Sequence, residues 1–146
     1  MIALDTVRLT TGDGAGSIEL AGDIPRNGPG NLSLTALGVE LKDIYGLAQR
    51  DTIGIGGTVI LDARLAGTAG APELRGTGAL TGGAFGDFQA PLIRSAFDYR
   101  DHLLRSNLTF WRTGQPVVEV DASLPFDLAL SGAPARRRLP GPLTIL

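Results

Sequence analysis

One short stretch of the chain brings its only histidine close to carboxylates, at Asp98-Tyr99-Arg100-Asp101-His102. A metal site or an acid–base pair needs such groups to converge. On an extended strand Asp98 and His102 would share one face, and Asp101 would point to the other. The chain has one His and no Cys, so a full ligand set would have to come from scattered Asp and Glu. We therefore expect a solvated polar face followed by a turn, and neither a metal nor a cofactor.

Serine chemistry would require His102 to act as a base beside Ser95, Ser106 or Ser123. None of these serines lies in the Gly-x-Ser-x-Gly pattern that forms a nucleophile elbow. With no cysteine, thiol nucleophiles and zinc–thiolate sites are excluded as well. The sequence predicts no catalytic residue, and we expect a protein that is not an enzyme.

The glycine-rich run GTGALTGG, residues 76–83, has the composition of a phosphate-binding loop. Such a loop must lead directly into a helix, whose first N–H groups meet the anion. Here AFGDFQAP follows, which has no helical stripe and ends at Pro91. We therefore interpret the longer stretch 65–83 as the end of one strand, a turn through Gly67 to Pro72, and a second strand.

A run of three arginines, Arg136-Arg137-Arg138, lies between Pro134 and Pro140. The prolines predict a loop, so the run is either a solvated basic turn or a contact for anionic lipid headgroups. The formal net charge of the chain is -2, which gives no electrostatic reason to expect nucleic acid as a partner.

Alternation of apolar and polar residues is the main structural pattern in this chain of 146 residues. With 21 Gly and 9 Pro to form turns, it favours an all-β fold in which one face of an antiparallel sheet is apolar. We expect turns at Gly12-Asp13-Gly14, Pro25 to Gly30, Asp101-His102 and Thr113-Gly114-Gln115. The expected strands include residues 18–22, 32–34, 53–65, 74–80, 92–99, 104–110 and 118–130.

One segment departs from this period. Leu37, Leu41, Ile44 and Ala48 recur at helical spacing, which predicts a short amphipathic helix over residues 39–49. The chain shows no signal peptide and no apolar run long enough to cross a membrane. It ends in an apolar, strand-like LTIL, which suggests a piece of a larger protein.

Alternation also predicts which side chains form the apolar face. Aliphatic and small residues dominate it, because aromatic residues make up only 5% of the chain. Such a face could pack within a sandwich or line a groove for flexible aliphatic guests. The residues expected on it are Val59, Leu61, Leu65, Leu74, Leu80, Phe97, Tyr99, Leu104, Leu108, Phe110, Val118, Val120, Leu124, Phe126 and Leu128.

The ordered succession of glycines, leucines and short signatures from Gly57 to Leu130 resembles one family, that of the translocation and assembly module protein TamB. TamB belongs to the AsmA-like group of bridge-like lipid transfer proteins. The resemblance is carried by Gly57, Leu61, Leu65, Gly67-Thr68, Pro72, Leu74, Gly76, Leu80 and Gly83, then Tyr99-Arg100-Asp101 and Leu104, then Gly114, Val118-Glu119-Val120 and Leu124-Pro125-Phe126-Asp127-Leu128.

The resemblance implies a long, curved antiparallel sheet folded lengthwise like a taco shell around an apolar groove. It further implies a periplasmic protein, anchored in the inner membrane through parts absent from this chain. That protein would move phospholipid between the inner and outer membranes and support outer-membrane protein assembly with a barrel partner. The partners implied for the groove are phospholipid acyl chains.

We therefore expect one β-rich segment over residues 1–146. Residues 1–50 would supply upstream strands and the helix, and residues 51–146 the TamB-like portion. The alternative is a structural or adhesive β-solenoid or sandwich with a closed interior and no role in lipid transport. A further hypothesis concerns Gly76 and Gly78, which share a strand face with Leu74 and Leu80. We expect the two glycines to help curl the sheet.

Overall fold

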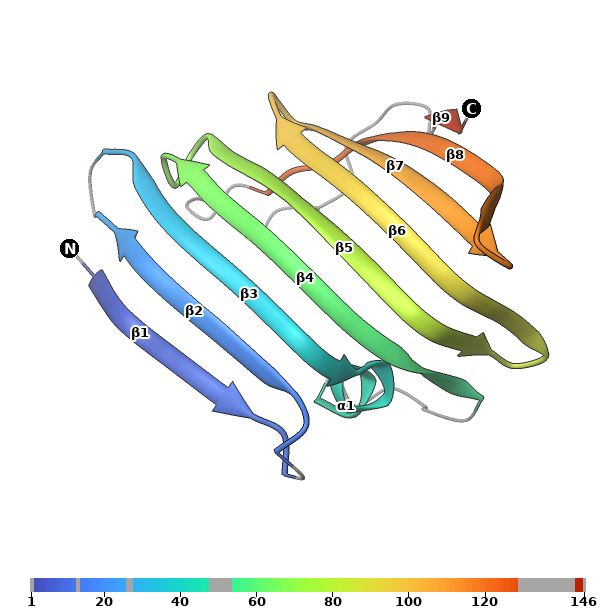
Figure 1. The fold of residues 1–146 in the computed structure, drawn as a ribbon. Coiled ribbons are helices and arrows are strands. Elements are labelled where there is room, and N and C mark those ends of the chain that lie inside the picture. The colour runs from blue at the N-terminus through green and yellow to red at the C-terminus, as the bar shows by residue number, and fades with distance from the viewer. Residues whose placement is uncertain (1, 13, 26–27, 48–53, 129–143, 146) are drawn as a thin grey trace.

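The computed structural model describes residues 2–12, 14–25, 28–47, 54–128 and 144–145. Nine strands form one antiparallel sheet in which every strand lies beside its neighbours in the sequence (Figure 1). This confirms the expected all-β fold: a single curved, unclosed sheet with one short helix. The elements are β1 (Ile2–Thr10), β2 (Ser17–Ile24), β3 (Gly30–Glu40), α1 (Leu41–Leu47), β4 (Ile55–Gly67), β5 (Pro72–Phe85), β6 (Phe88–Arg100), β7 (Leu103–Arg112), β8 (Gln115–Pro125) and β9 (Thr144–Ile145).

Tight turns join the longest strands where turn residues predicted them. Asp101 and His102 connect β6 to β7 with φ of 52° and 60°, the positive values that a two-residue type I′ hairpin requires. Thr113 and Gly114 connect β7 to β8 with φ of 51° and 78°. The turn through Gly67 to Pro72 also lies as predicted, with Thr68 and Ala71 exchanging backbone hydrogen bonds of 3.2 and 3.1 Å. These short connections fix the antiparallel register of β4 with β5 and of β6, β7 and β8 with one another.

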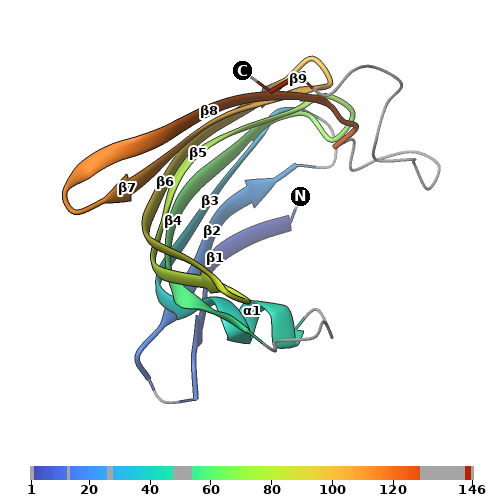
Figure 2. The same ribbon diagram turned by 90° about the vertical axis from the view of Figure 1, so that its right-hand side faces the viewer.

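Irregularities in the sheet accompany its curvature. The register shifts between Ala36 and Val39 where β3 pairs with β4, and between Gly56 and Thr58 where β4 pairs with β5. Each bulge contains a glycine in the left-handed region, Gly38 at φ 65° and Gly57 at φ 121°. A bulge bends its strand and increases the local twist. Figure 2 shows the strands curving strongly at this end of the sheet, with α1 inside the curve.

Gly76 and Gly78, which were predicted to help curl the sheet, lie in β5. Both pair across β4 and β5, opposite Ala63 and Leu61. A Cβ atom at Gly76 would lie 2.6 Å from Cζ of Phe97 and 2.6 Å from the backbone oxygen of Asp62. The Phe97 ring therefore covers the glycine, which is not turned to water. Absence of a side chain here permits close approach of the ring and the neighbouring strand.

The helix is shorter than its sequence pattern predicted. It begins at Leu41 and ends at Leu47, while Val39 and Glu40 belong to β3. The predicted stripe also included Leu37, which is a strand residue with 51% of its surface exposed. A strand that continues for two residues beyond Gly38, through Val39 and Glu40, displaces the start of the helix. Ala48 and Gln49 lie outside the described residues.

Two corrections concern strands near the two edges of the sheet. The alternation through residues 118–130 predicted one continuous strand, but β8 ends at Pro125. Proline has no N–H to donate to a neighbouring strand. Phe126 still donates a 3.0 Å backbone hydrogen bond to the oxygen of His102 in the β6–β7 turn, but Phe126 and Leu128 lie beyond the strand, and Leu130 is outside the described residues. The second correction lies at the opposite edge of the sheet, where β1 was not predicted from the sequence as a strand.

The sheet remains a single open layer. The accessible surface of the chain is 9819 Å², compared with about 7,100 Å² expected for a compact protein of its mass. Among the described residues, Val39 and Tyr99 are the two large side chains that are almost wholly buried, at 1% and 2% exposure. A closed solenoid or sandwich interior, as the alternative required, would bury many such side chains. The described strands instead leave one apolar face open.

Candidate functional site: an apolar trough

Strand pairing places most of the predicted apolar residues on one face. Starting from Leu65, successive partners across β4 to β8 are Leu74, Tyr99, Leu104 and Leu124. The other predicted residues within these strands lie in neighbouring rows of cross-strand partners. All these rows belong to the same face, because partners across an antiparallel sheet share a face. Thirteen of the fifteen predicted residues thus lie together, and the two exceptions are Phe126 and Leu128 beyond β8.

The same rows continue into strands from which no apolar-face residue was predicted. Leu61 pairs with Ala36 on β3, Ala36 with Ile18 on β2, and Ile18 with Leu9 on β1. We call the resulting surface, from Leu9 on β1 to Val120 on β8, the apolar trough. Strands had been predicted over residues 18–22 and 32–34, within β2 and β3, without an assigned face, and none had been predicted for β1. Further members are Val7, Leu20, Leu32, Leu34, Val39, Ala63, Ile93 and Ala122.

The trough lies on the concave side of the sheet. Leu32, Ala36, Val39, Ala63 and Tyr99, five of the six buried apolar residues described, belong to it. In Figure 2 the helix α1 lies inside the curve, beside the end of β3 that carries Val39. Because the helix covers this side of the sheet, Val39 is only 1% exposed.

Few polar groups interrupt the trough from β2 to β8. Its rows contain the hydroxyls of Ser95, Ser106 and Tyr99. The Tyr99 hydroxyl is engaged, because its oxygen accepts a 3.1 Å hydrogen bond from the backbone N–H of Leu128. The segment after β8 therefore crosses one end of the trough and buries Tyr99 to 2% exposure. At the two sides of the sheet the trough is open, with Leu9 60% and Val118 51% exposed.

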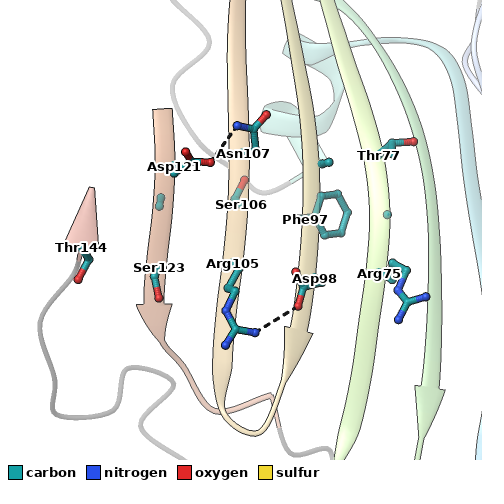
Figure 3. Close-up of a pocket in the computed structure, with 13 residues that line it drawn as sticks. Arg75, Thr77, Phe97, Asp98, Arg105, Ser106, Asn107, Asp121, Ser123 and Thr144 are labelled. Carbon is teal, nitrogen blue, oxygen red and sulfur yellow. Dashed lines mark hydrogen bonds and ion pairs between the residues drawn. The ribbon is translucent and has the colours of Figure 1, made fainter. Parts of the chain in front are cut away.

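The opposite face carries charges and hydrogen-bonding groups. Arg105 and Asp98 form an ion pair at 3.7 Å across β6 and β7. Asn107 donates hydrogen bonds to Glu119 at 3.2 Å and to Asp121 at 2.9 Å, and Figure 3 shows the contact with Asp121. A twisted sheet is saddle-shaped, so this face is hollowed as well. Two hollows of about 780 and 670 Å³ lie on it and share Arg75, Asp98 and Arg105. We call this surface the polar face.

The residues considered for chemistry are dispersed. His102 lies in the β6–β7 turn, with Nδ1 3.7 Å from a carboxylate oxygen of Asp127. Ser95 and Ser106 belong to the trough, and Ser123 pairs with Arg105 on the polar face. Within the described ranges no three His, Cys, Asp or Glu side chains are grouped to hold a metal ion.

Two further expectations concern membranes. The candidate headgroup contact Arg136-Arg137-Arg138 lies outside the described residues. In the part of the chain that the structure describes, no helix has the length and apolar character needed to cross a bilayer.

Comparison of the chain with known protein families, with curated proteins and with solved structures finds no match. Functional interpretation therefore depends on the trough and its chemistry. The trough provides a broad aliphatic surface backed by a solvated polar face, and the described residues bring no nucleophile beside a base.

Proposed function

We propose that the apolar trough binds the acyl chains of phospholipid, and that the chain is a segment of a TamB-like cell-envelope protein. The observation that carries this proposal is the continuity of the trough. Apolar rows cross eight strands, and the side chains on the outermost ones remain exposed. A monomeric soluble protein rarely leaves so long an apolar surface uncovered without a ligand or partner for it.

The energetics of lipid movement favour such a surface. A diacyl phospholipid carries roughly 30 methylenes, and each costs about 0.8 kcal/mol to expose to water. Bare transfer between membranes would therefore cost some 24 kcal/mol by the same scale. A continuous aliphatic trough removes most of this cost, and no covalent chemistry is needed.

The resemblance to TamB extends the proposal beyond this segment. In that context the trough is one stretch of a periplasmic conduit between the inner and outer membranes. The parent protein would be anchored in the inner membrane and would support outer-membrane protein assembly with a barrel partner. These roles belong to the parent protein, and the trough supplies its acyl-chain surface.

The direct test is mass spectrometry of lipid that co-purifies with the chain. Leu61→Asp places a charge in the centre of the trough and should abolish lipid recovery. Ile60→Asp is a matched control, because Ile60 precedes Leu61 on β4 and is 48% exposed on the polar face. Circular dichroism would confirm that both variants keep their strand content. Equal lipid recovery from the two variants would rule out the trough as the binding surface.

A further inference from the structure

Two arginines on the polar face lie directly opposite each other. Arg64 on β4 pairs with Arg75 on β5, in a register that is unbroken from Thr58 to Gly67. Directly paired residues have Cβ atoms about 4.5–5.5 Å apart, and like charges in such a pair destabilise the sheet. Both side chains are exposed, so the structure places two guanidinium groups within reach of one ligand.

The carboxylates near this pair already have other partners. Glu73 binds Arg100 at 2.8 Å, and Asp98 binds Arg105 at 3.7 Å. Asp62 accepts a hydrogen bond of 3.4 Å from a threonine hydroxyl on β3. Among the described residues, no ion pair forms to Arg64 or Arg75. The pair therefore keeps positive charge that the neighbouring acids do not neutralise.

The pair also faces a space that can hold a ligand. Arg64 and Arg75 line the hollow of about 670 Å³, together with Arg100 and Arg105. Four arginines thus surround this hollow, against the three carboxylates of Asp62, Glu73 and Asp98. Figure 3 shows Arg75 on the strand next to the Asp98–Arg105 pair. The hydroxyl of Thr77 lines the hollow too and can donate a hydrogen bond, whereas the Ser33 hydroxyl already donates to the backbone oxygen of Ala21 at 3.2 Å.

We infer that Arg64 and Arg75 bind a phosphate group on the polar face. A guanidinium presents paired N–H donors that match the oxygens of phosphate, and two opposed guanidiniums can hold one tetrahedral anion. Binding would also relieve the repulsion between the two arginines. This site lies on the face opposite the apolar trough and does not depend on the trough binding lipid.

Isothermal titration with pyrophosphate at constant ionic strength tests the site. The unmodified chain should show saturable binding, and Arg64→Gln or Arg75→Gln should each weaken it by about five- to tenfold. The same variants should melt about 1–4 °C higher without ligand, because each removes the like-charge contact. A surface that binds anions only by net charge would be weakened equally by the loss of an arginine elsewhere on the chain.

Arg112→Gln is the matched control, since it removes an exposed arginine at the β7–β8 turn, away from the hollow. It should bind pyrophosphate as the unmodified chain does. Absence of saturable binding, equal weakening by Arg112→Gln, or unchanged binding by Arg64→Gln would each overturn the proposal.

A second arm identifies the source of the phosphate group. Flotation with vesicles of phosphatidylcholine containing phosphatidylglycerol, compared with phosphatidylcholine alone, reports on lipid headgroups. Arginine-dependent binding to the anionic vesicles would assign the site to headgroups, and binding of pyrophosphate alone would assign it to a free phosphate compound. Leu61→Asp should leave pyrophosphate binding intact, so failure of the trough and failure of this site are distinguishable.

Discussion

Substitution of Gly76 by alanine should destabilise the sheet, although alanine is normally the better strand residue. Glycine inside a strand costs about 0.5–1 kcal/mol relative to alanine, and Gly76 has no positive φ that would demand glycine. The added Cβ would however lie 2.6 Å from the backbone oxygen of Asp62 and 3.0 Å from Cα of Ala63. Backbone atoms in paired strands cannot move away cheaply, and the Phe97 ring would also be displaced. Overpacking of this kind costs about 1–3 kcal/mol.

Gly78 provides the matched comparison, two residues along the same face of β5. A Cβ there would lie 3.1 Å from the Ser95 hydroxyl, which can rotate, and 3.6 Å from a methyl of Leu61. Gly78→Ala should therefore be neutral, or more stable by about 0.5–1 kcal/mol because of the lower entropy of the unfolded chain. Because the entropy of the unfolded chain falls equally in both variants, they should differ by the overpacking cost alone, about 1–3 kcal/mol.

Urea unfolding followed by circular dichroism measures this difference from the transition midpoints, provided that the slopes agree. Phe97→Leu combined with Gly76→Ala should recover part of the loss, because the smaller side chain frees the space over residue 76. If Gly76→Ala is as stable as Gly78→Ala, close approach of strand and ring is not the reason for glycine at this position.

Three further predictions follow from contacts at the trough and on the polar face. Val39→Ala should lower the free energy of unfolding by about 1–3 kcal/mol, measured in urea, because Val39 is only 1% exposed beside α1; a loss below about 0.5 kcal/mol would contradict its burial. Tyr99→Phe should cost about 0.5–1.5 kcal/mol and speed amide exchange at Leu128, which would lose its hydrogen-bond acceptor; unchanged exchange there would exclude that contact in solution. The hydrogen bond and then the charge of Glu73 raise the pKa of Arg100. Arg100 therefore stays charged across the ordinary pH range, and the stability that it contributes should be constant from about pH 6 to 9 and lost only as the pH rises through its raised pKa. Glu73→Gln should lower the urea midpoint slightly at low salt and have no effect near 0.5 M NaCl; a loss independent of salt would show that the pair is not merely a surface one.

Strand location could be predicted where alternation was long. Apolar residues recur at every second position from Val59 to Leu65, and the structure places β4 over residues 55–67 and β5 over residues 72–85 with Leu61 and Leu65 on one face. Ile53, the first residue of the expected strand, lies outside the described residues. Successive side chains of a strand point to opposite faces, so the face on which each residue lies can be predicted from the local sequence alone. Turn positions were predictable for the same reason, as Asp101-His102 shows.

The errors arose where a local pattern competed with the rest of the sheet. Leu37 fits a helical stripe, but pairing of β3 with β2 and β4 extends the strand past it. Phe126 and Leu128 continue an apolar alternation beyond Pro125, where pairing with β7 ends. Neither outcome can be derived from periodicity, because both depend on which backbone groups find partners.

The polar face shows another limit of sequence-based prediction. Arg64 and Arg75 are eleven positions apart in the chain and carry no motif. Their juxtaposition follows from the length of the turn between β4 and β5, together with the register that the turn imposes. Shifting that register by one residue would place the two arginines on opposite faces.

Strand order has a consequence for how far the trough can reach. Because every strand lies beside its neighbour in the chain, the eight strands from β1 to β8 span seven intervals of about 4.8 Å, or roughly 34 Å. One acyl chain fills half of a hydrocarbon core about 30 Å thick, so about two chains fit end to end along this distance. Each added hairpin would extend the trough by about 10 Å and leave its cross-section unchanged. In such an architecture the distance covered is set by the number of hairpins, and the character of the surface by the residues that alternate within each one.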